Sequence, residues 1–75
     1  TRRASGLLGG ARAAQNLLVL KTSPGHANSI AIALDQEEWP EVVGTIAGDD
    51  TVLVIAPDAG TAAALGKRLL AYLEA

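Results

Sequence analysis

Two adjacent carboxylates lie in the segment GTIAGDDT, residues 44–51. Apolar runs flank this segment, with Val42-Val43 before it and residues 52–56 after it. Glycine and short polar side chains are what a tight turn between antiparallel strands requires, so we predict a β-hairpin over about residues 42–56. Such a turn does not need two neighbouring negative charges, which repel each other unless a cation neutralises them. This surplus charge makes Asp49 and Asp50 the first candidates for a binding site.

The remaining segments predict the element order β-β-α-β-β-α. In chain order we expect a strand over residues 6–10, a loop over 11–16, a strand over 17–22, a helix over 24–38, the hairpin, and a helix over 61–73. Ser23 and Thr61 suit the N-cap positions of the two helices, and Pro24 suits the first helical residue. Pro40 prevents the first helix from continuing.

These elements predict an α+β fold. We expect a two-layer sandwich in which a four-stranded, mostly antiparallel sheet has two helices on one face. The 75 residues make a single domain, residues 1–75. A domain this small buries only about 60% of the surface that its unfolded chain exposes, yet 49% of its residues are hydrophobic. We therefore expect a partner subunit to cover the second face of the sheet.

Composition excludes several classes of function. The formal net charge of -2 argues against nucleic-acid binding by this chain alone, because phosphate recognition needs a cationic patch. The absence of cysteine excludes disulfides and thiolate metal sites, which fits the reducing conditions of a cytoplasmic protein. No apolar run approaches the roughly 20 residues of a membrane span, and no signal peptide is recognisable. We expect a chain that begins Thr1-Arg2-Arg3 to be part of a longer protein.

The predicted first helix has an apolar stripe and a polar stripe. Spacing of i, i+3, i+4 and i+7 defines the apolar stripe, Ala27, Ile30, Ala31 and Leu34. Asn28 and Asp35 share another face, two turns apart, with Ile32 between them. An amide and a carboxylate there can bind an ammonium group or an amino-acid backbone. A solvated helix face explains the same spacing more simply.

The acidic turn also has alternative interpretations. Asp49 and Asp50 can be turn residues exposed to water, or they can bind a planar guanidinium through paired hydrogen bonds. A divalent metal is less well supported, because no further carboxylate or histidine lies at a tight ligand spacing. A catalytic triad of Ser23, His26 and Asp35 is also poorly supported, since Ser23 is better explained as a helix cap.

Two motifs together resemble the C-terminal domain of bacterial arginine repressors. They are TSPG at residues 22–25, leading into a helix that ends near Asp35, and GTIAGDDT at residues 44–51. The resemblance covers about residues 17–73. It implies an oligomerisation domain whose trimers pair into a hexamer, with L-arginine bound between the trimers as corepressor. It also implies a separate N-terminal winged-helix domain, absent from this chain, that binds the operator DNA of arginine biosynthesis genes.

The resemblance further implies which residues contact L-arginine: Asn28, Asp35, Thr45, Ala47, Asp49 and Asp50. We expect Asp49 to reach the ligand guanidinium across the trimer interface. Asp35, Asp50 and Asn28 are expected to hold the α-amino and α-carboxylate end, with Asn28 or backbone N–H groups meeting the carboxylate. Neither a metal nor a cofactor other than the arginine ligand is implied.

Two positions depart from the family pattern. Many relatives have glutamine where Asn28 stands, and its side chain is one methylene longer. Some have arginine at Ile32, where it can pair with the first aspartate of the turn when ligand is absent. Because Ile32 cannot form this pair, we expect the ligand-free form to rest more on trimers.

Two functional hypotheses follow, of different kinds. The first is an arginine-responsive domain that controls hexamer formation. The second is a purely structural assembly domain without a small ligand, which the open sheet face alone would explain. An enzyme is the least supported class, because the sequence offers no paired nucleophile and base.

Overall fold

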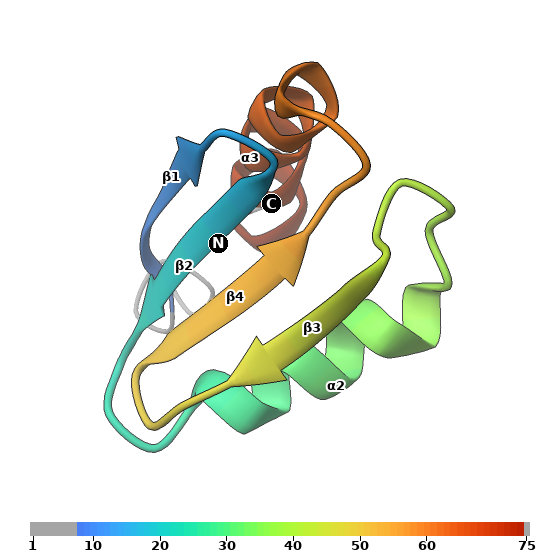
Figure 1. Cartoon of the computed structure of the whole chain (residues 1–75). Coiled ribbons are helices and arrows are strands. Elements are labelled where there is room, and N and C mark those ends of the chain that lie inside the picture. The colour runs from blue at the N-terminus through green and yellow to red at the C-terminus, as the bar shows by residue number, and fades with distance from the viewer. Residues whose placement is uncertain (1–7, 75) are drawn as a thin grey trace.

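The elements follow one another in the predicted order β-β-α-β-β-α. The computed structural model describes residues 8–74, and side chains within residues 9–71. Its elements are β1 (Leu8–Ala14), β2 (Leu17–Thr22), α2 (Ala27–Glu37), β3 (Gly44–Ala47), β4 (Thr51–Ile55) and α3 (Ala59–Glu74) (Figure 1). The predicted hairpin is formed by β3 and β4, which pair antiparallel on either side of the acidic turn.

All four strands form one antiparallel sheet in the order β1-β2-β4-β3. Both helices lie behind this sheet in Figure 1, and its other face carries no helix of the described chain. The α+β sandwich with two helices on one face is therefore confirmed. Helix α2 packs on β3 and β4, whereas α3 packs mainly on β1 and β2.

Alternation along the two central strands builds the core. Leu18 and Leu20 of β2 and Val52 and Val54 of β4 are fully buried beneath the helices, because successive strand residues point to opposite faces. The helices complete the core with Ala27, Ile30, Ala31, Leu34, Ala62, Leu65 and Leu69. The apolar stripe predicted for the first helix is the face that α2 buries.

The N-terminal prediction was wrong in its boundaries. Strand β1 continues to Ala14, through residues expected to form a loop, and only residues 15–16 make the turn. Pairing with β2 satisfies the backbone groups of this segment, and Ala11 packs against the core. Gly10, with φ of 156°, lies at the irregular pairing near the strand's start. Residues 6 and 7 of the predicted strand lie outside the described part of the chain.

Both helix starts also differ from the prediction. Helix α2 begins at Ala27 with His26 as N-cap, because Gly25 has φ of 83° and the His26 N–H bonds to the Ser23 carbonyl at 3.0 Å. The segment predicted as a first helical turn is thus a tight turn. Helix α3 begins at Ala59, where a side-chain oxygen of Asp58 accepts the Thr61 N–H at 2.7 Å. Asp58, rather than Thr61, provides the cap.

Gly66 allows the close approach of α3 to β2. A Cβ at this buried position would lie 3.2 Å from Leu18 Cδ1. We expect Gly66→Val to lower the free energy of unfolding by about 1–3 kcal/mol, because the added carbons overpack the core. The matched change Ala63→Val, at an exposed site of α3, should lower it by only about 0.6 kcal/mol through helix propensity. Urea unfolding followed by circular dichroism measures both, and equal losses would contradict the close packing.

Candidate functional site

The acidic turn is fixed to the start of α2 by its backbone. The Asp49 carbonyl accepts hydrogen bonds from the N–H groups of Gly25 at 3.0 Å and Ala27 at 3.4 Å. The Asp50 carbonyl accepts one from the Thr22 N–H at 2.7 Å. Ala27 supplies one of the N–H groups that a helix start cannot satisfy internally. The TSPG segment (residues 22–25) and the acidic turn (residues 48–50) are therefore one structural unit, although residues 25 and 48 are 23 positions apart in the sequence.

Asp35 and Thr45 meet at the edge of the sheet. The Thr45 hydroxyl donates a hydrogen bond of 2.9 Å to the Asp35 carboxylate. Thr45 and Ala47 lie opposite Val54 and Val52 in the β3–β4 ladder, so both face the helix layer. This pairing brings together three of the predicted ligand positions, from α2 and β3.

Asn28, another predicted ligand residue, lies on the exposed outer face of α2. Asn28 and Asp35 are both exposed, and Ile32 between them has 48% of its surface accessible. No hydrogen bond of the Asn28 side chain is found among the described residues. An amide, a carboxylate and an apolar side chain therefore line an accessible strip of α2 beside the edge strand β3.

The two aspartates of the turn have different side-chain environments. Asp49 is exposed, and its carboxylate has no ion pair or hydrogen bond among the described residues. One Asp50 oxygen accepts the Thr51 hydroxyl at 3.0 Å, and the other lies 3.5 Å from Lys21 Nζ. Lys21 Nζ also donates to the Thr51 hydroxyl oxygen at 2.9 Å, which closes a three-residue network.

The network holds Asp50 in its charged form. The hydrogen bond from Thr51 and then the positive charge of Lys21 lower the pKa of Asp50 below its ordinary value. Because the folded-state pKa is depressed, these interactions stabilise the fold above the ordinary pKa. Their contribution is lost as the pH falls through the lowered value. Asp50 is therefore ionised at neutral pH.

Sequence reasoning missed Lys21 and Thr51. The sequence pattern places Lys21 only within the strand over residues 17–22, and Thr51 only at the end of the GTIAGDDT motif. Their pairing depends on the β2–β4 register, in which Lys21 lies opposite Thr51 across 30 residues of sequence. The sequence does show a lysine at the end of one apolar run and an acidic turn at the start of another. This pattern predicts an ion pair only once the two strands are known to be neighbours.

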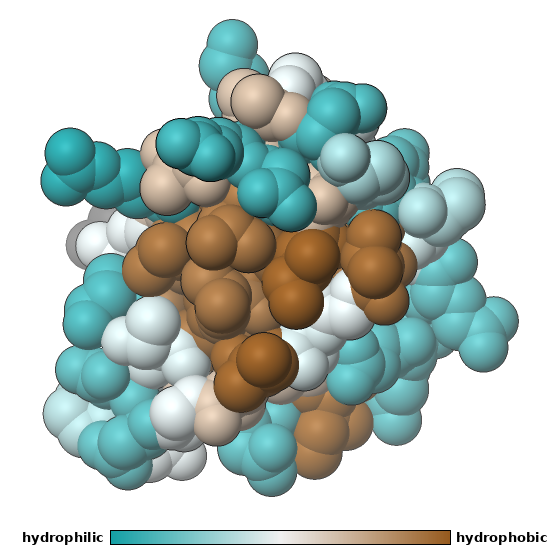
Figure 2. All heavy atoms as spheres, viewed as in Figure 1, coloured by the Kyte–Doolittle hydropathy of each residue, from teal (hydrophilic) through white to brown (hydrophobic). Residues whose placement is uncertain are grey.

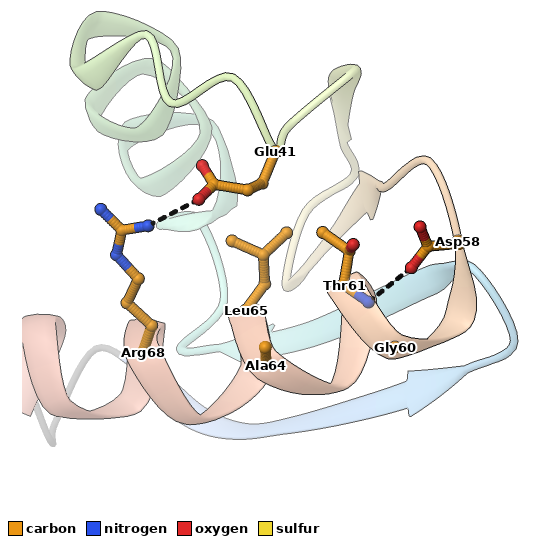
Figure 3. A pocket seen from close by; sticks show the side chains of 7 residues that line it. All are labelled: Glu41, Asp58, Gly60, Thr61, Ala64, Leu65 and Arg68. Carbon is orange, nitrogen blue, oxygen red and sulfur yellow. Dashed lines mark hydrogen bonds and ion pairs between the residues drawn. The ribbon is translucent and has the colours of Figure 1, made fainter.

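A separate pocket of about 410 Å³ lies between α3 and the segment that joins α2 to β3 (Figure 3). Arg68 of α3 reaches across it to Glu41, with 3.2 Å between Nη1 and Oε2. The guanidinium carbon of Arg68 also lies 3.9 Å from the ring centroid of Trp39. None of the six predicted ligand residues lines this pocket. We interpret these contacts as a clamp that holds the α2–β3 segment against α3.

Residues 8–74 contain neither a metal-binding cluster nor a membrane-spanning helix. There, no group of three or more histidine, cysteine, aspartate or glutamate side chains is arranged to hold a metal ion. No helix in this part of the chain has the length and apolar character needed to cross a bilayer.

Comparison with known proteins decides the family. The sequence profile described as "Arginine repressor, C-terminal domain" matches residues 5–71. The chain belongs to the arginine repressor C-terminal domain family. The expected resemblance is therefore confirmed over most of the chain.

Individual arginine repressors support the same assignment. The chain is 77% identical over 61 residues to an arginine repressor of Solibacter usitatus, covering 81% of this chain and 42% of that protein. It is 61% identical over 56 residues to one of Acidobacterium capsulatum, covering 75% and 38% respectively. It is 55% identical over 58 residues to one of Staphylococcus carnosus, covering 77% and 39%. The chain thus spans less than half the length of these relatives.

The Asp50 network gives a direct test in solution. We expect Thr51→Val and Lys21→Met each to raise the pKa of Asp50, because the Thr51 hydrogen bond and then the charge and hydrogen bond of Lys21 lower it. Titration of the Asp50 carboxyl carbon by NMR measures both shifts. An unchanged pKa of Asp50 in either variant would contradict the network.

Proposed function

We propose that the chain is an L-arginine-sensing and oligomerisation domain of a transcriptional repressor. The observation that supports this most directly is the union of TSPG and GTIAGDDT into one unit, with Asp49 left accessible and unpaired beside it. Family membership supports the same function, because the similar proteins of Solibacter usitatus and Acidobacterium capsulatum are named arginine repressors. In this proposal arginine is the corepressor, and operator DNA is bound by a domain outside this chain.

The proposed division of roles follows from charge and geometry. Asp49 is the partner of a ligand guanidinium reached from a neighbouring trimer, since a carboxylate accepts paired hydrogen bonds from that planar group. Asp35, Asp50 and Asn28 hold the α-amino and α-carboxylate end. Among the proposed ligand residues, Asn28 or backbone N–H groups suit the ligand carboxylate, because aspartates repel it. Thr45 and Ala47 form the strand wall beside Asp35.

The second face of the sheet supports self-association. Figure 2 shows hydrophobic side chains gathered at the centre of the face opposite the helices. This apolar sheet face consists of Leu17, Val19, Ile46, Leu53 and Ile55. Ile46 has 61% of its surface accessible. Contiguous apolar surface of this kind is typical of interfaces, and we propose that it is buried between subunits of a trimer.

The proposed mechanism is thermodynamic linkage. A ligand held by residues of two trimers binds the hexamer better than it binds separate trimers, so it shifts the equilibrium towards the hexamer. The hexamer then presents the DNA-binding domains as a group. Arginine concentration is thereby converted into operator occupancy.

Calorimetric titration with L-arginine tests the ligand. We expect the wild-type chain to release or absorb heat on binding, and Asp49→Asn to weaken binding at least tenfold, because a charge-assisted pair is lost. The matched variant Glu38→Gln removes one charge from an exposed site after α2 and should bind as the wild type does. Absence of heat at millimolar arginine in the wild type would reject the proposal.

Sedimentation tests the assembly surface. We expect Ile46→Lys to convert the assembly to monomers, because burying an unpaired ammonium in an apolar interface is strongly unfavourable. Ile46 is largely exposed within one subunit, so the variant should fold normally and give the circular dichroism spectrum of the wild type. An unchanged sedimentation coefficient would place the interface elsewhere.

The alternative is a structural assembly domain without a ligand, which the apolar sheet face favours. Sedimentation with and without arginine separates the two. An assembly state that does not respond to arginine supports the structural alternative. Neither hypothesis assigns the chain a catalytic activity.

A further inference from the structure

The acidic turn already contains a cation, and it comes from the same chain. Lys21 Nζ lies 3.5 Å from Asp50 Oδ2 and donates a hydrogen bond of 2.9 Å to the Thr51 hydroxyl oxygen. Thr51 in turn donates to Asp50 Oδ1 at 3.0 Å. The carboxylate is therefore oriented by Thr51 and neutralised by Lys21, and these are two separable tasks.

Strand register determines the position of Lys21. It is the last residue of the β2–β4 ladder and lies directly opposite Thr51. Lys21 alternates with the buried Leu20 and Thr22, so its side chain lies on the sheet face away from the helices. The β2–β4 pairing thus delivers an ammonium group to the base of the acidic turn.

The Lys21 contact holds the Asp50 carboxylate towards the sheet face opposite Thr45. Thr45 faces the helix layer and bonds to Asp35 there, whereas Lys21 and Thr51 lie on the opposite face. A ligand group that reaches Asp50 must therefore meet the ammonium of Lys21 as well. A cationic group and Lys21 would compete for the same carboxylate.

We propose that Lys21 is an intramolecular stand-in for the cationic group of the ligand: it neutralises Asp50 until that group reaches the turn and displaces it. This inference rests on the proposed function of the turn as an arginine site. In this role Lys21 helps to set the arginine concentration to which the domain responds. Lys21 itself does not bind the ligand.

The exposure of the pair makes such an exchange feasible. The side chains of Lys21 and Asp50 are 55% and 48% accessible. Solvent-exposed ion pairs of this kind are weak, whereas a guanidinium can engage a carboxylate with two hydrogen bonds. Breaking the Lys21–Asp50 pair on binding therefore costs little free energy. This cost lowers the affinity for the ligand by a modest factor and does not prevent binding.

Lys21→Met tests the stand-in role in the 75-residue chain. Methionine keeps most of the side-chain length and removes the charge, while Thr51 still orients Asp50. We expect calorimetry to show L-arginine binding about two- to fivefold more tightly than in the wild type, the range that a weak exposed pair allows. Agmatine, which lacks the carboxylate of arginine, should gain by a similar factor. Lys21→Arg should bind no more tightly than the wild type.

The control and the opposing outcomes are specific. Lys67→Met removes the same charge from an exposed site of α3 and should leave affinity unchanged, and sedimentation should give both variants the same assembly state. If Lys21→Met weakens arginine but not agmatine, Lys21 holds the ligand carboxylate and the proposal is overturned. Unchanged affinity for both ligands also overturns it. If the wild type itself binds no arginine, the proposed function fails first and this inference falls with it.

Discussion

The antiparallel pairing of β2 with β4 is the interaction on which the rest of the structure depends. It places the two central strands side by side and buries Leu18, Leu20, Val52 and Val54 together. At its end it also brings the segment before α2 against the acidic turn. The core and the candidate site are therefore products of one register. A shift by a single residue would move every buried side chain of one strand to the open face.

The acidic turn uses its backbone and its side chains for different purposes. The carbonyl groups of Asp49 and Asp50 anchor the turn to residues 22–27, a task that any residue type could perform. Their carboxylates take no part in this anchoring. One is neutralised within the chain and the other is exposed, so the two charges are not equivalent although they are adjacent in the sequence.

Local patterns predicted most of the fold but not its long-range pairing. The hairpin around residues 48–50, both helices and the buried stripe of α2 follow from turn residues and periodicity within short windows. Strand β1 was misplaced because its glycines and alanines have little strand propensity, and pairing with β2 overrides that preference. The six ligand residues came from a motif resemblance and stay predictions. Lys21 was missed because its role depends on a partner 30 residues away.

The main-chain anchoring of the turn has a consequence for how such domains diversify. Since carbonyl oxygens of residues 49 and 50 make the backbone hydrogen bonds of the turn, side-chain replacement at either position leaves those bonds intact, and at position 50 it removes only the contacts with Lys21 and Thr51. The turn can therefore exchange its recognition chemistry without rebuilding the fold around it. A small sheet-and-helix scaffold of this design can therefore vary the surface of this turn one substitution at a time.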